Sequence, residues 1–68
     1  MIAPQLERYF QLRLEWKLEV EPEVKARLRR ELDAATENIC REHSLSFGPR
    51  EFLEHTRQAF IQWAKRSR

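Results

Sequence analysis

The chain has 68 residues, of which 41% are hydrophobic, and its formal net charge of +2 is too small to indicate a nucleic-acid partner by itself. One cysteine excludes an internal disulfide, a single glycine excludes a glycine-rich phosphate loop, and no apolar run approaches the ~20 residues of a membrane span. With no signal-peptide pattern at its start, the sequence predicts one small cytoplasmic domain, residues 1–68, whose thin core gains stability from a second copy of the chain.

The segment 10–21 has the most regular pattern of the chain. Apolar and polar side chains alternate at all twelve positions, from Phe10 to Glu21. A period of two is typical of a strand that buries one face. The sequence therefore predicts a strand over 10–21, although its Leu, Glu, Lys, Arg and Gln residues are good helix formers.

A helix over residues 4–20 is the alternative for the same segment. In a helix, Arg13 and Lys17 would fall in the middle of the apolar arc, and would lie one turn apart with like charges. Glu15 and Glu19 would repel one another in the same way. These conflicts favour the strand, and an all-α three-helix bundle remains the alternative fold.

A lone strand needs a partner for its backbone donors and acceptors. No second segment alternates, so the simplest partner is the same strand of a second copy, antiparallel about a two-fold axis. With Trp16 on the axis, Glu15 faces Lys17 of the partner subunit, and Arg13 faces Glu19 of the partner subunit, both with opposite charges. The predicted dimer interface comprises an apolar face of Leu12, Leu14, Trp16, Leu18 and Val20, and a charged face of Arg13, Glu15, Lys17 and Glu19.

Two helices follow the predicted strand, over 22–43 and 49–66. Pro22 and Pro49 suit the first position of a helix. Apolar residues recur three and four positions apart in both segments, which is the spacing of one buried helix face. The predicted fold class is therefore α+β, with one intermolecular ribbon backed by two helices from each chain.

Few residues indicate a metal-binding or catalytic site. Cys40 and His43 stand one helical turn apart, as do Glu51 and His55, but this mixture is far from the spacing of a zinc site. No orienting group or oxyanion donor accompanies the cysteine. We expect Cys40 to be a buried apolar residue, both histidines to lie at the surface, and the protein to have no catalytic residue, metal or cofactor.

The function that the sequence favours is a small non-enzymatic, dimeric protein-interaction module: an adaptor, an inhibitor or an assembly subunit. The charged outer face and the two edges of the predicted ribbon offer surfaces for a protein partner.

A dimeric nucleic-acid-binding regulator is the alternative function. The order strand–helix–helix resembles the topology of the ribbon-helix-helix DNA-binding proteins, without a shared sequence motif, and in that family the paired ribbon enters the major groove. The outward ribbon positions here carry three glutamates and a net charge of −1 per strand, which opposes phosphate binding. Nucleic acid would instead meet the basic helix faces and the C-terminal tail, through Arg27, Arg30, Arg50, Lys65, Arg66 and Arg68.

Overall fold

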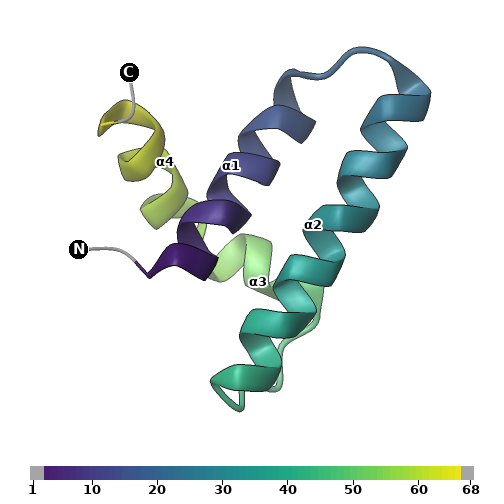
Figure 1. Cartoon of the computed structure of the whole chain (residues 1–68). Coiled ribbons are helices and arrows are strands. Elements are labelled where there is room, and N and C mark those ends of the chain that lie inside the picture. The colour runs from purple at the N-terminus through teal and green to yellow at the C-terminus, as the bar shows by residue number, and fades with distance from the viewer. Residues whose placement is uncertain (1–2, 67–68) are drawn as a thin grey trace.

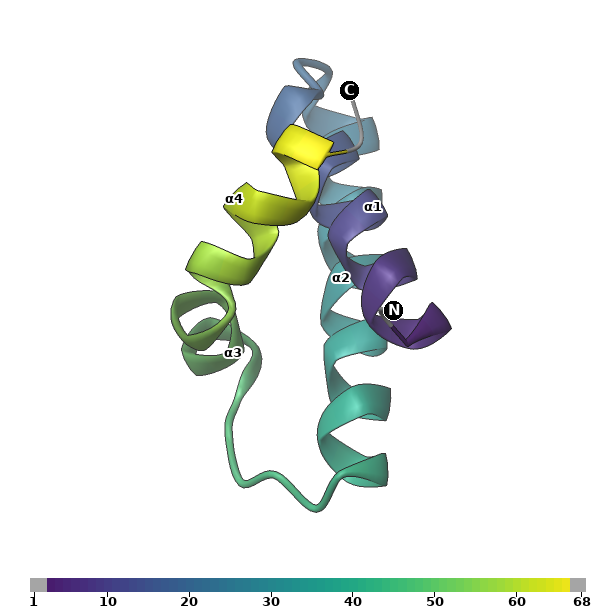
Figure 2. The same cartoon turned by 90° about the vertical axis from the view of Figure 1, so that its left-hand side faces the viewer.

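The computed structural model describes residues 3–66, and four helices make up most of this range. These are α1 (Pro4–Leu18), α2 (Pro22–Glu42), α3 (Pro49–His55) and α4 (Arg57–Arg66). Helices α1 and α2 form an antiparallel hairpin, and α3 and α4 form an arm that packs across it (Figures 1 and 2). Helix α3 contacts α2, and α4 contacts α1. Within the described range, none of the helices has the length and apolar character that crossing a bilayer requires.

The predicted strand over 10–21 is wrong. Residues 10–18 belong to α1, and Glu19–Glu21 form the extended link to α2. The part of the chain that the structure describes contains no strand, so the antiparallel ribbon centred on Trp16 is wrong as well. The fold is all-α, as in the alternative. Helix propensity and tertiary packing outweigh the like-charge pairs, each of which costs only a few tenths of a kcal/mol.

Prolines mark where helices begin. Pro4, Pro22 and Pro49 are the first residues of α1, α2 and α3, where the missing N–H costs no hydrogen bond. The helix predicted over 22–43 is confirmed, with its end at Glu42.

The helix predicted over 49–66 is interrupted at Thr56. The Thr56 hydroxyl donates a hydrogen bond of 2.6 Å to the carbonyl oxygen of Phe52, which also accepts the Thr56 backbone N–H. Such back-bonding often bends a helix, although Thr36 makes the same bond to the carbonyl oxygen of Leu32 within the continuous α2. The bend divides the arm into α3, whose backbone lies against α2, and α4, whose backbone lies against α1.

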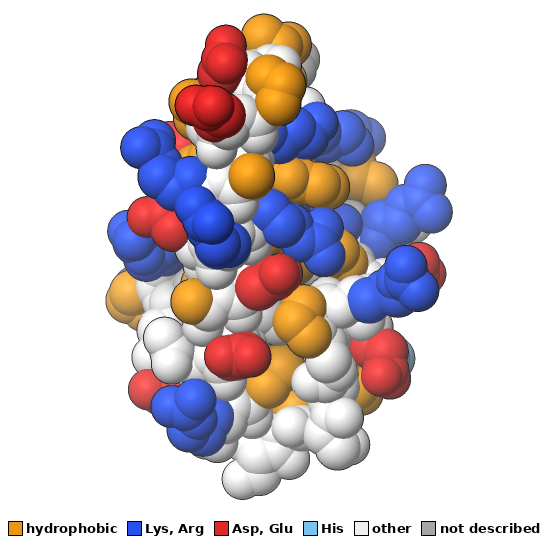
Figure 3. All heavy atoms as spheres, turned by 90° about the vertical axis from the view of Figure 1, so that its right-hand side faces the viewer, with side chains coloured by type: hydrophobic (Ala, Val, Ile, Leu, Met, Phe, Trp, Pro, Cys, Tyr) orange, Lys and Arg blue, Asp and Glu red, His pale blue; other side chains and the backbone are white. Residues whose placement is uncertain are grey.

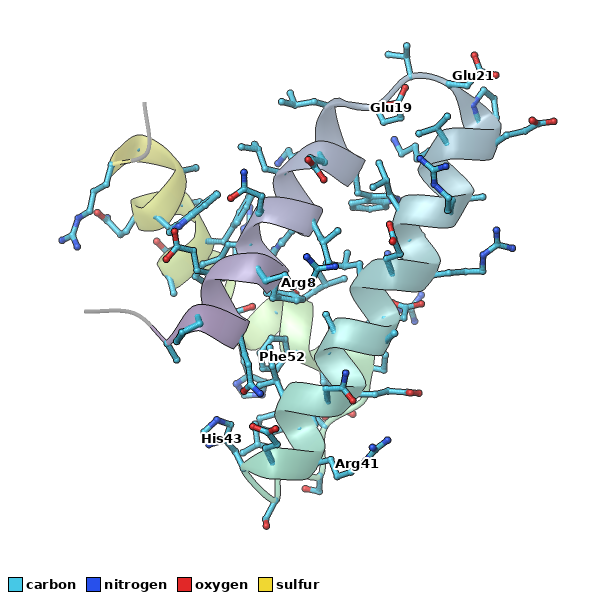
Figure 4. All side chains as sticks on the ribbon, viewed as in Figure 1. Arg8, Glu19, Glu21, Arg41, His43 and Phe52 are labelled. Atoms are coloured by element: carbon cyan, nitrogen blue, oxygen red, sulfur yellow. The ribbon has the colours of Figure 1, made fainter. Side chains whose placement is uncertain are left out.

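The core lies where α1 meets both α2 and the arm. Tyr9 and Phe10 are almost fully buried. The Tyr9 ring meets the Phe52 ring edge-on, with 4.9 Å between centroids, and the Phe10 ring lies 5.7 Å from the rings of both Phe60 and Trp63. Phe52 points from α3 toward the hairpin (Figure 4). The buried hydrophobic residues are Tyr9, Phe10, Leu12, Leu28, Leu32, Ile39, Cys40, Phe52 and Phe60.

The different burial of two leucines distinguishes the observed helix α1 from the predicted strand. A strand would place Leu12 and Leu18 on one face, whereas in α1 their exposed fractions are 6% and 70%. We expect Leu12→Ala to lower the free energy of unfolding by about 2–5 kcal/mol, because it opens a cavity in the core. Leu18→Ala should change it by less than ~0.5 kcal/mol. Urea denaturation followed by circular dichroism measures both, and equal losses would contradict the helical assignment.

Candidate functional site

Four helices enclose a basic groove beside Trp16. Its volume is about 440 Å³, within the roughly 300–1,000 Å³ typical of ligand sites. Figure 3 shows basic side chains on both sides of an apolar strip on the face where α2 lies. We call this feature the Trp16 groove, and it is lined by Arg13, Trp16 and Lys17 from α1, Lys25 from α2, Leu53 and Glu54 from α3, and Arg57 from α4.

Two cations of α2 lie over the Trp16 ring. The Lys25 Nζ atom is 5.3 Å from the ring centroid, and the Arg29 Cζ atom is 5.2 Å from it. Both distances allow cation–π attraction. Lys25 and Arg29 stand one turn apart on α2, so their side chains share a face of that helix. Arg29 also donates from Nε to Asp33 Oδ1 at 3.2 Å, which holds its guanidinium in place.

Arg13 bridges α1 to the arm. Its Nη1 donates to Thr56 Oγ1 at 3.1 Å, and its Cζ lies 4.5 Å above the centre of the Phe60 ring. The side chain is half-buried. A guanidinium has five N–H donors, so the bond to Thr56 leaves others for a ligand in the groove that Arg13 lines.

The Trp16 groove carries an excess of positive charge. Arg13, Lys17, Lys25 and Arg57 line it together with a single acid, Glu54, which gives a local balance of +3. Among residues 3–66 the one ion pair joins Arg29 to Asp33, so the four cations of the groove have no acidic partner there. A concave surface lined by one sign of charge focuses its field and attracts anions.

Tyr9 lies in the core close to Arg13 and Thr56. Its exposed fraction is 0%, and burial raises the pKa of its hydroxyl above the usual value, because the charged form loses its hydration. The nearby Thr56 hydroxyl and Arg13 guanidinium lower this pKa, but by less than burial raises it. Neither forms a hydrogen bond of good geometry to the Tyr9 oxygen, which has no such partner in the described chain.

The apolar residues of the predicted dimer interface do not form one face. Leu12 lies in the core of its own chain, and Leu14 and Trp16 pack against that core. Leu18 and Val20 are 70% and 90% exposed. The ribbon interface is therefore wrong, because a helical α1 distributes these side chains around its axis.

The charged residues of that interface are also separated. Arg13 and Lys17 line the Trp16 groove, whereas Glu15 is exposed elsewhere on α1. The Glu19 carboxylate accepts the backbone N–H groups of Val20 and Glu21, each at 3.0 Å. Glu19 thereby stabilises the α1–α2 link, where Figure 4 labels it.

The residues predicted to meet nucleic acid lie on different elements. Arg27 and Arg30 are exposed on α2, and Arg50 is exposed on α3. Lys65 and Arg66 end α4, whose backbone lies against α1 and α3 rather than α2 in the described part of the chain. Arg68 lies outside the described residues. The structure does not gather this set into one patch.

The cysteine and the histidines are dispersed. Cys40 is a buried free thiol, as expected, and His43 is exposed at the end of α2, on the opposite side of the helix from Arg41 (Figure 4). His55 stacks on Phe47 with 4.4 Å between ring centroids. Within residues 3–66, no three His, Cys, Asp or Glu side chains are placed to hold a metal ion.

No protein-family model, curated protein or solved structure matches the chain, so the groove is interpreted from its own residues. The sequence pattern predicts no site role for Lys25 or Arg57, and it places Arg13 and Lys17 on a ribbon. The available signal was the position of Arg13 and Lys17 inside the apolar arc of a helical segment 4–20, where two cations need an unusual environment.

The single tyrosine of the chain permits a direct test of its burial. Absorbance of tyrosinate should titrate with a midpoint above the ordinary value of about 10, because the folded pKa of Tyr9 is raised. The unfolded chain then loses this proton at lower pH than the folded chain, so the contribution of Tyr9 to stability falls as pH rises above ~10.

Tyr9→Phe removes that contribution and the unpartnered hydroxyl. At neutral pH we expect the free energy of unfolding to stay equal or to rise by up to ~1 kcal/mol. Circular dichroism over the same pH range shows whether the helices persist. A titration midpoint at or below the ordinary value, with the helices intact, would contradict the buried position.

Proposed function

We propose that this chain is a small non-enzymatic protein-interaction module, an adaptor, inhibitor or assembly subunit, that binds an acidic segment of a partner protein in the Trp16 groove. The observation that supports this function is the convergence of four cations from three helices on one groove with a single acid. A partner that supplies carboxylates would neutralise this charge and would gain affinity and orientation from it.

Several features favour a protein partner over nucleic acid. The Trp16 ring already carries Lys25 and Arg29 over its surface, whereas proteins that bind single strands offer their aromatic rings to the bases. Glu19, Glu21 and Glu23 lie at the end of the hairpin from which Lys25 extends, and they would repel the phosphates of a long duplex. A short acidic segment can occupy the groove and avoid these glutamates.

The proposed module does not require a homodimer, because every wall of the groove comes from one chain. The dimer inferred from the sequence depended on the ribbon, and the mass in solution tests it separately. We keep the cytoplasm as the proposed location, where a reducing environment preserves a free thiol such as Cys40.

Charge reversal in the groove tests the proposed function. A labelled ten-residue peptide rich in glutamate and aspartate should bind the unmodified protein, with affinity measured by fluorescence anisotropy. Arg57→Glu should weaken this binding roughly tenfold or more, because it places a like charge against the ligand. Lys25→Glu should act in the same direction.

Arg30→Glu is the matched control, since it makes the same charge change at an exposed position of α2 that does not line the groove. Equal losses for Arg30→Glu and Arg57→Glu would show that only net charge matters and would reject the groove as the site. The alternative function, a nucleic-acid-binding regulator, makes the opposite prediction. Random duplex DNA would bind with micromolar affinity that falls steeply as salt is added, and the acidic peptide would not bind. That result would reject our proposal.

A further inference from the structure

The charge of the Trp16 groove exceeds what one carboxylate can balance. Its lining has four positive side chains and one negative. A carboxylate carries one negative charge, whereas a phosphorylated serine or threonine carries about −1.5 to −2 on three acceptor oxygens. We infer, on the basis of the proposed function, that the acidic segment recognised here carries a phosphorylated serine or threonine whose phosphate lies among Arg13, Lys17, Lys25 and Arg57.

Two of the four cations have the shape that phosphate recognition uses. Arg13 and Arg57 come from α1 and α4, and each guanidinium presents paired N–H donors that match two oxygens of a phosphate. Lys17 and Lys25 add compact charges from α1 and α2. A phosphate offers three acceptor oxygens, one more than a carboxylate, and can therefore receive donors from several helices at once with more sites left over.

Arg13 is held in place before any ligand arrives. Its bond to Thr56 and its position over the Phe60 ring fix the guanidinium in a half-buried setting. A preorganised donor loses less conformational entropy on binding than a free side chain. A partly buried setting also strengthens the attraction to an anion.

Neighbouring grooves lack this charge. The groove between α1 and α2 that Arg8 lines also contains Glu31, so its cation is balanced by an acid. The groove beside Leu18 contains Glu15 and Glu19 against Arg27 alone. The phosphate preference is therefore assigned to the Trp16 groove rather than to the general charge of the surface.

Three peptides with one sequence test this inference. Each has flanking glutamates, and the central residue is serine, glutamate or phosphoserine. Anisotropy titrations should show the phosphoserine peptide binding about tenfold more tightly than the glutamate peptide, because additional charge-assisted hydrogen bonds form. Arg57→Lys keeps the charge but removes the paired donors, so it should lower the affinity for the phosphoserine peptide more than the affinity for the glutamate peptide and thereby reduce this preference.

The outcomes separate this inference from the proposed function. Equal affinity for the glutamate and phosphoserine peptides would reject phosphate recognition and leave the acidic-segment module intact. If none of the three peptides binds, both the phosphate recognition and the proposed function are rejected. Phosphoserine preference that Arg13→Lys and Arg57→Lys both leave unchanged would overturn the assignment of the arginines. A single-stranded oligonucleotide that binds as tightly as the phosphoserine peptide would show phosphate binding without a protein partner and would also overturn the inference.

Discussion

The structure depends on the burial of α1 against two surfaces at once. A domain of this size has a thin core, and α1 supplies its two most deeply buried aromatic rings, Tyr9 and Phe10. Tyr9 meets Phe52 of α3, while Phe10 meets Phe60 and Trp63 of α4. Because α2 covers another side of α1, the solvent-exposed face in the middle of this helix is the one that carries Glu7, Arg8, Gln11 and Glu15. A charged side chain that lies outside this face, such as Arg13, needs a partner or an opening.

The Trp16 groove follows from that constraint. Arg13 projects from α1 toward the bend of the arm, where the Thr56 hydroxyl and the Phe60 ring receive it. Lys17, one turn further along α1, lines the same opening. Lys25 approaches from α2, with its ammonium over the Trp16 ring. The packing that builds the core thus brings cations from separate segments to one concave surface, and these cations are the basis of the proposed function.

Much of the helical organisation was predictable from local signals. Pro22 and Pro49 begin helices as expected, and the apolar spacing predicted α2 almost to its last residue. The bend at Thr56 was not predicted, because a threonine that bonds the carbonyl four residues earlier leaves no mark on the apolar spacing. The strand over 10–21 was wrong because alternation along the sequence reports side-chain polarity, not backbone conformation. A helix in contact with two partners can show the same alternation, since its apolar side chains need more than one narrow face.

The sequence alone determined that the chain has proline-initiated helices, a single cysteine and basic residues in excess of acidic ones. These features depend on composition and on interactions between near neighbours. Only the tertiary structure decided that Arg13, Lys25 and Arg57 share one groove, because they come from three helices and the contacts between those helices are non-local. The same contacts decided that Leu12 is buried and Leu18 is exposed. The alternating sequence pattern had predicted both leucines on one buried face.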